Sequence, residues 1–224
     1  MTLLVDKYKY PATTRETIDG KRHYVSEGLD PVPSVTTILD STKDKTFLIA
    51  WRKRVGEEKA RQITTEAAGV GTSMHTYLEK YVKGETIKAG SNHVHQQGFK
   101  MAEIVIAKGL SQVNELWGSE VSLYYPGLYA GTTDGVGVFN GNPAIIDFKQ
   151  TNKPKKEEWV EDYYLQLVAY AMAHNEMHGT DIREGHVLMC SRDLEYQQFD
   201  LTPNRWNEYQ DKWLARVEQY YASR

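Results

Sequence analysis

Two aspartates and a lysine, Asp134, Asp147 and Lys149, stand in a segment whose turn chemistry can bring them together. Asn140-Gly141 lies between two apolar runs and favours a type I′ hairpin turn, because both central residues of that turn need positive φ. The register set by a two-residue turn places Asp134 opposite Asp147. Lys149 follows two residues later, so it projects from the same face of the strand. The sequence therefore predicts two carboxylates and an ammonium group at one place.

This grouping has a chemical consequence. Directly opposed side chains lie about 4.5–5.5 Å apart at Cβ, and two ionised carboxylates at about 5 Å repel by roughly 3 kcal/mol at an effective dielectric of about 20. A divalent cation between Asp134 and Asp147 turns the repulsion into ligation, and oxygen ligands favour Mg²⁺ or Mn²⁺ over zinc. Lys149 can then support an attacking water or a developing negative charge. Taken singly, each residue also has a structural explanation, as a turn, strand-end or surface charge.

The hydrophobic pattern indicates the elements that must position these residues. After Leu116 the pattern is typical of strands, which we expect at Glu120–Tyr124, Gly131–Phe139, Pro143–Gln150, His186–Ser191 and Tyr196–Leu201. A long helical stretch, about Lys156–His178, interrupts the strands, and an amphipathic helix over Pro203–Tyr221 closes the chain. We therefore expect an α+β fold in this half of the chain.

The first half of the chain has a helical pattern after an opening stretch that favours irregular structure or a short hairpin. From Ser34, a candidate N-cap, apolar residues recur at threes and fours and predict two or three helices. Gly69-Val70-Gly71 predicts a break before a helix that carries His75, and another helix is expected over Val94–Lys108. We expect residues 1–115 to form a helical region covering the site and residues 116–224 to form the core, within one compact unit.

A basic stretch precedes the predicted site. Residues 43–62 hold seven basic and three acidic side chains, whereas the whole chain has a net charge of −3. Arg52, Lys53 and Arg54 are candidates for binding nucleic-acid phosphates, and the neighbouring Trp51 could stack on a base. A solvated helix face and a core tryptophan are the alternatives.

Composition excludes several classes of protein. A hydrophobic share of 40% with 11% aromatic residues excludes a disordered or fibrous chain. The single cysteine, Cys190, excludes an internal disulfide and an iron–sulfur cluster held by this chain's own cysteines. The sequence has no apolar run of membrane-spanning length and no secretory or transit pattern, so we expect a cytoplasmic protein without a membrane partner. It identifies no protein partner.

The order of these residues resembles the RecB-type branch of the PD-(D/E)xK nucleases. Asp147-Phe148-Lys149 matches the D/E-x-K element, Gln166 and Tyr170 match the Q-x-x-x-Y helix motif, and His75 matches an upstream helical histidine. Three further stretches resemble the mitochondrial genome maintenance exonuclease and its phage and bacterial relatives, namely Pro33–Leu39, Gly71–His75 with Leu78-Glu79, and Trp213–Glu218. Thr133 departs from the pattern, since it stands where the superfamily name places proline. With no transit pattern in the sequence, the resemblance implies a protein of a bacterial or phage-infected host cell.

The resemblance implies a PD-(D/E)xK core, an α+β fold with a mixed sheet flanked by helices, that hydrolyses DNA with one or two Mg²⁺ or Mn²⁺ ions. Asp134 and Asp147 are the implied metal ligands, and His75, Glu120 and the Phe148 carbonyl are additional candidates. The implied catalytic group comprises Asp134, Asp147, Lys149 and Gln166, whereas Tyr170 either stacks on a base or packs beneath the site. Glu120 could instead be a solvated strand-end charge, and His75 could simply pair with Glu79 one helical turn later.

We therefore expect a metal-dependent exonuclease that degrades single-stranded DNA from free ends. A structure-specific flap endonuclease of the same fold is one alternative, because the motif sets the chemistry and not the need for an end. A non-catalytic DNA-binding module is the other. The presence of Asp134, Asp147 and Lys149 together argues against a module without activity.

Overall fold

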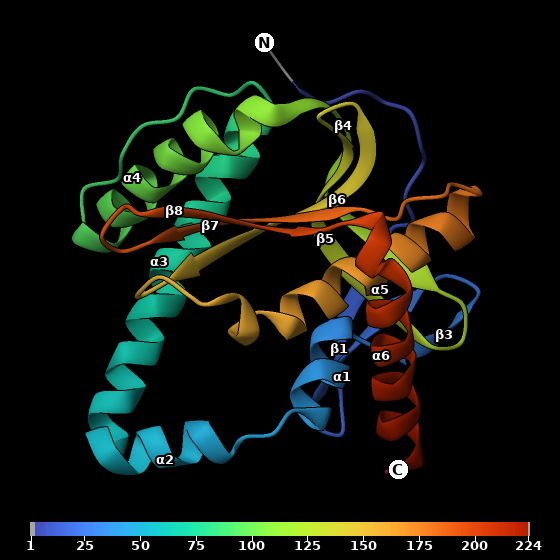
Figure 1. The fold of residues 1–224 in the computed structure, drawn as a ribbon, viewed down its shortest axis with the longest axis horizontal. Coiled ribbons are helices and arrows are strands. Elements are labelled where there is room, and N and C mark those ends of the chain that lie inside the picture. Colours follow the sequence, from blue (N-terminus) through green and yellow to red (C-terminus); the bar gives the residue numbers. More distant parts are fainter. Residues whose placement is uncertain (1–2, 224) are drawn as a thin grey trace.

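A mixed five-stranded sheet organises the second half of the protein (Figure 1). The computed structural model describes residues 3–223. The strands are β4 (Val113–Tyr125), β5 (Tyr129–Phe139), β6 (Asn142–Thr151), β7 (Gly185–Ser191) and β8 (Tyr196–Leu201), side by side in chain order. Neighbouring strands are antiparallel except β6 and β7, which are parallel and are joined by helix α5 (Glu161–His178). The prediction of an α+β fold with a mixed sheet is confirmed.

Helices cover both faces of this sheet. Helices α3 (Glu57–Val82) and α4 (His93–Lys108) pack on one face, and α1 (Val35–Thr42), α5 and α6 (Pro203–Ala222) pack on the other. Alternation along β6 sends Ile145 into the core beneath α5 and Ile146 into the core beneath α3. Within residues 3–223 no helix has the length and apolarity to cross a membrane.

The turn between β5 and β6 has the geometry that its sequence predicts. Asn140 and Gly141 both have positive φ, at 46° and 88°. Phe139 pairs with Asn142, and the same register continues to Gly135 opposite Ile146. The next position in that register would place Asp134 opposite Asp147, so the hairpin delivers both aspartates to the same end of the β5–β6 pair.

Strand β4 is longer than expected, because it begins at Val113 and contains Glu120 near its middle. Its register with β5 shifts twice, between Val113 and Glu115 and between Leu116 and Gly118. Glu120 follows the second irregularity with a φ of 53°, a value uncommon for a residue with a side chain. The expectation that Glu120 opens a strand is therefore wrong. Ser119 pairs with Gly135 and Val121 with Thr133, so the β4–β5 register places Glu120 beside Asp134.

The opening segment is a small antiparallel sheet rather than irregular structure or a single hairpin. Its strands are β1 (Thr14–Ile18), β2 (Lys21–Ser26) and β3 (Leu29–Pro33). Ser34 then caps α1, since its hydroxyl oxygen accepts the Thr37 N–H at 2.9 Å. The predicted N-cap is confirmed, and helix α1 therefore begins directly after strand β3.

Helix α3 runs without interruption through the predicted glycine break. An interior glycine costs about 1 kcal/mol relative to alanine, which tertiary packing readily offsets. Here the packing is against α4, where a Cβ on Gly69 would lie 3.2 Å from Val94, and one on Gly98 would lie 2.6 Å from Ser73. These glycines permit close helix approach instead of ending a helix. Helix α2 (Thr46–Val55) precedes α3 and, together with the N-terminal turns of α3, stands off the body in Figure 1.

Candidate active site

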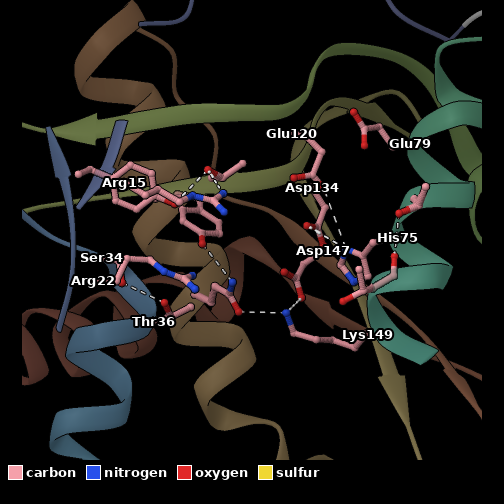
Figure 2. Close-up of a pocket in the computed structure, with 18 residues that line it drawn as sticks. Arg15, Arg22, Ser34, Thr36, His75, Glu79, Glu120, Asp134, Asp147 and Lys149 are labelled. Atoms are coloured by element: carbon pink, nitrogen blue, oxygen red, sulfur yellow. Dashed lines mark hydrogen bonds and ion pairs between the residues drawn. The ribbon is translucent and has the colours of Figure 1, made fainter. Parts of the chain in front are cut away.

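A cavity of about 500 Å³ collects side chains from both halves of the chain. Figure 2 shows His75 of α3, Glu120 of β4, Asp134 of β5 and Asp147 of β6 directed toward one another. The predicted site residues that line it are His75, Glu120, Asp134, Asp147, Lys149, Gln166 and Tyr170. Residues far apart in sequence thus meet where strands β4, β5 and β6 face helices α3 and α5.

One part of the cavity is a group of three potential metal ligands. His75, Glu120 and Asp134 each offer a ligand atom, and these atoms lie within 4.8 Å of one another. His75 Nδ1 is 3.4 Å from Asp134 Oδ1 and 3.9 Å from Glu120 Oε1. The second oxygen of Asp134 accepts the Phe148 N–H at 2.7 Å, which fixes the carboxylate. Two carboxylates and an imidazole form a donor set that suits a divalent cation.

Asp147 and Lys149 form the second part. Asp147 is 1% exposed, and its Oδ2 lies 2.5 Å from Lys149 Nζ. This short contact compensates the buried carboxylate with the positive charge of the Lys149 ammonium group.

A hydrogen-bond chain holds the lysine in place. Lys149 Nζ donates to Gln166 Oε1 at 3.1 Å, and Gln166 Nε2 donates to the Tyr170 hydroxyl at 3.1 Å. Lys149 Nζ also lies 5.2 Å from the centre of the Tyr163 ring. These contacts give Gln166 the role of holding the lysine.

The two aspartates differ in their electrostatic surroundings. Burial raises the pKa of Asp147 to about 6, against the opposing effect of Lys149. Burial also acts to raise the pKa of Asp134, but the charges of His75 and Lys149 and the Phe148 N–H hold it below its ordinary value. The electrostatic cost of placing two carboxylates close together therefore raises the pKa of Asp147, whereas the pKa of Asp134 stays below its ordinary value.

The two cationic groups are both charged at neutral pH in the metal-free protein. Burial acts to lower the pKa of His75, but Asp134 and Glu120 raise it to about 10. Burial likewise opposes the charge on Lys149, but Asp147 and Asp134 raise the pKa of its ammonium group. Lys149 is therefore a hydrogen-bond donor and a fixed positive charge, not a proton acceptor.

Some contacts differ from those expected. Glu79 lines the cavity but pairs with Lys83 at 2.5 Å, so the plain pairing of His75 with Glu79 is wrong. Phe148 contacts the cluster through its N–H, which donates to Asp134, and metal binding by its carbonyl stays a prediction. Tyr170 is 3% exposed, and a Cβ on Gly131 would lie 2.6 Å from its ring. The Tyr170 ring therefore packs beneath the site.

The basic stretch lies outside this cavity. Arg52, Lys53 and Arg54 are exposed on α2, a helix in which no side chain is buried. Trp51 on the same helix is half-buried, so it is not a core residue. Arg52 lines a separate surface hollow with residues of the first turns of α3. The structure thus places these predicted nucleic-acid-binding residues on an outlying helix.

Sequence reasoning missed one wall of the cavity. It comprises Arg15, Arg22, Tyr24, Ser34, Thr36 and Thr132, from the small sheet, the start of α1 and strand β5. The small sheet docks on β5 through a hydrogen bond between the Tyr24 and Thr132 hydroxyls at 3.0 Å. Ser34 and Thr36 stand in the Pro33–Leu39 stretch that carries part of the resemblance, whereas no local pattern marks the others as site residues, because only this docking brings them to the cavity.

Known proteins resemble the chain mainly in sequence. No family model matches it. It is 29% identical to the Homo sapiens protein named mitochondrial genome maintenance exonuclease 1 over 206 residues, which are 84% of this chain and 58% of that protein. The Xenopus tropicalis protein of the same name is 25% identical over 244 residues, 98% of this chain and 65% of that one. The chain thus spans about three fifths of the length of these curated relatives.

Among solved structures, a protein from Eubacterium rectale that bears a provisional exonuclease name has a TM-score of 0.48 and 14% identity, over 67% of this chain and 64% of that one. This likeness is too low to establish a shared fold. The sequence comparisons stand on their own. Over most of its length the chain is similar to proteins named mitochondrial genome maintenance exonuclease 1, which confirms the resemblance that its motifs predicted.

Proposed function

We propose that this protein is a Mg²⁺- or Mn²⁺-dependent nuclease with a PD-(D/E)xK core that degrades single-stranded DNA from free ends. The observation that carries the proposal is the meeting of His75, Glu120 and Asp134 with the Asp147–Lys149 pair in one cavity. The exonuclease names of the sequence relatives support the same activity.

In the proposed reaction, water adds to the phosphorus and one ester P–O bond breaks, leaving a phosphomonoester on one product and a hydroxyl on the other. Asp134, Asp147, Glu120 and His75 would hold one or two divalent cations, which would lower the pKa of a bound water and neutralise phosphate charge. Lys149 donates hydrogen bonds to the attacking water or to a phosphate oxygen as negative charge grows. Gln166 keeps the ammonium group directed at that point.

We further propose that residues 1–115 cover the core formed by residues 116–224 and guide a strand into it. Helix α3 contributes His75 and Gly71 to the cavity wall, so the first half of the chain is part of the site. Helix α2 offers the exposed cations Arg52, Lys53 and Arg54 with no buried residue to hold it down. A surface of this kind suits contacts to the phosphates of an entering strand.

The experiment compares linear and circular single-stranded DNA of equal length, with Mg²⁺, with Mn²⁺ and with a chelator. We expect degradation of the linear form with either metal, little action on the circle or on blunt duplex, and none with the chelator. The double variant Arg52→Ala with Lys53→Ala should raise KM and spare kcat, since these residues would contact ground state and transition state alike.

Two results would favour other functions. Efficient cleavage of the circle would favour an endonuclease and remove the requirement for an end. If the protein binds DNA equally well with a chelator and cleaves it with neither metal, a non-catalytic module would be favoured. Flap substrates with a blocked end separate the structure-specific endonuclease from an enzyme that must start at a terminus.

Metal binding is expected to release a proton from His75. The pKa of His75 is about 10 when no metal is bound, so the imidazole carries a proton at pH 8, and it must lose that proton to become a ligand. Calorimetric titration with Mn²⁺ in buffers of different ionisation enthalpy should show close to one proton released per cluster. The variant His75→Gln should release none from this group, and equal release by both proteins would exclude His75 as a ligand.

A further inference from the structure

We propose that Arg15 and Arg22 form a second phosphate-binding subsite, which holds a phosphate next to the one that is cleaved. This inference rests on the proposed nuclease function and extends the site to the small N-terminal sheet. Both arginines line the same cavity as Asp134 and Lys149. Figure 2 shows them on the side of the cavity opposite His75 and Glu79.

The two guanidinium groups are not occupied by acidic partners. Neither arginine forms an ion pair with any carboxylate in residues 3–223, although Glu79, Glu120, Asp134 and Asp147 line the same cavity. The carboxylates gather on one side and the arginines on the other. A cavity divided in this way can hold a cation and, beside it, the anionic backbone that the cation attracts.

The β1–β2 register places both arginines on one face. Arg15 pairs with Tyr24 and Thr17 pairs with Arg22, so Arg15 and Arg22 are diagonal neighbours on the same side of the ribbon. Diagonal neighbours on paired strands lie about 7–8 Å apart at Cβ, within reach of two long side chains that bind one phosphate. Guanidinium groups suit this role because their forked donors match phosphate oxygens.

Contacts hold the Arg15 side chain and the Arg22 backbone in position. Arg15 Nη2 donates to Thr132 Oγ1 at 3.0 Å, and its guanidinium lies 5.6 Å from the Tyr24 ring. The Arg22 carbonyl accepts the Ser34 N–H at 3.0 Å and the Thr37 hydroxyl at 3.0 Å, which ties this strand position to the start of α1. The remaining guanidinium donors stay available to a ligand.

The anchor of Arg15 connects it to the reacting centre. Thr132, which accepts the Arg15 hydrogen bond, and Asp134 are two residues apart on β5, so their side chains leave the same face of the strand about 6.6 Å apart. Arg15 is therefore anchored on the strand face that carries a candidate metal ligand, as a site for a phosphate next to the cleaved one requires.

The test combines a charge change in the protein with one in the substrate. Single-stranded oligonucleotides carry one uncharged methylphosphonate linkage, moved stepwise from each end. For the wild type, one position near the cleaved bond should lower kcat/KM by about tenfold, as expected for the loss of one charge-assisted contact. In Arg15→Gln with Arg22→Gln, kcat/KM on normal DNA should already be lower by a similar factor, and the same neutral linkage should cause no further loss.

Binding without cleavage gives a second readout. In the presence of a chelator, the salt dependence of affinity for an unmodified oligonucleotide should lose about 0.7 from its logarithmic slope in the double variant, the value for one single-strand phosphate contact. The matched control is Arg183→Gln, an exposed arginine paired with Asp181 and outside this cavity, which should behave as wild type in both assays.

The outcomes separate this inference from the proposed function. If the wild type cleaves DNA and the neutral-linkage loss persists unchanged in the double variant, the subsite is wrong and the nuclease proposal stands. If the wild type cleaves no DNA with either metal, the nuclease proposal is wrong. A double variant with a lowered melting temperature and an unchanged linkage profile would assign the arginines a structural role and overturn the subsite.

Discussion

Lys149→Ala should lower kcat by about 10²–10³-fold while DNA binding changes little, because loss of one preorganised donor at a developing charge typically has this effect. The structure supports such preorganisation, since the ammonium group lies between Asp147 at 2.5 Å and Gln166 at 3.1 Å. Single-turnover cleavage and chelator-treated binding measure the two effects separately.

Lys153→Ala is the matched control for this prediction. Lys153 is an exposed lysine four positions along the chain, so its removal changes the net charge equally without touching the cavity. Because Lys149→Ala removes the cation beside Asp147, the melting temperature of the metal-bound variant should be measured to confirm that it is folded. Near wild-type turnover by a folded Lys149→Ala protein would remove Lys149 from the mechanism.

Asp147→Asn should abolish cleavage and yet stabilise the metal-free protein at neutral pH. Burial raises the pKa of Asp147 to about 6, so folding becomes less favourable when this carboxyl is ionised. A tenfold change in the proton affinity of a carboxylate corresponds to about 1.4 kcal/mol, which gives an expected gain on the order of 1–3 kcal/mol. In a protein of this size each kcal/mol raises Tm by about 2–4 °C.

The pH dependence has a definite sign. The folded protein binds more protons at Asp147 than the unfolded chain does between about pH 4 and pH 6, so wild-type stability falls as pH rises through this window. The advantage of Asp147→Asn should therefore be small near pH 4 and complete above pH 6. Thermal unfolding in chelator across this range measures it.

Asp134→Asn is the informative comparison. Its carboxylate is stabilised by His75 and the Phe148 N–H, which hold its pKa below the ordinary value, so this variant should gain no stability at neutral pH. Added Mn²⁺ should raise the Tm of wild type more than that of either variant, because a ligand that binds only the folded state stabilises by mass action. Equal stabilisation of all three proteins would show that neither aspartate holds the metal.

The hairpin and its consequences could be predicted from local sequence. Asn140-Gly141 determines a turn with positive φ at both residues, and the two-residue period of the strands then determines which side chains share a face. For this reason the sequence alone was enough to predict that Asp134, Asp147 and Lys149 lie close together. The Gln166–Tyr170 spacing likewise follows from the helical period, which puts both residues on one face of α5.

Other features depended on packing between distant segments. The glycines of α3 signal a break when considered locally, but contact with α4 keeps the helix continuous. Glu120 lies beside Asp134 because of the β4–β5 register, which two irregularities earlier in β4 shift and which no local propensity indicates. His75 lies near Asp134 only because α3 packs on that end of the sheet, and that proximity in turn raises its pKa.

The sequence by itself therefore determined the chemistry of this protein's core, namely the hairpin, its two aspartates and lysine, and the helix that holds the lysine. These depend on turn geometry and on periods of 2 and 3.6 residues, which act over short distances along the chain. Only the tertiary structure decided which of the two aspartates bears the cost of burial, and that Arg15 and Arg22 face the same cavity. Those outcomes depend on desolvation and on docking between segments more than a hundred residues apart, which no local pattern encodes.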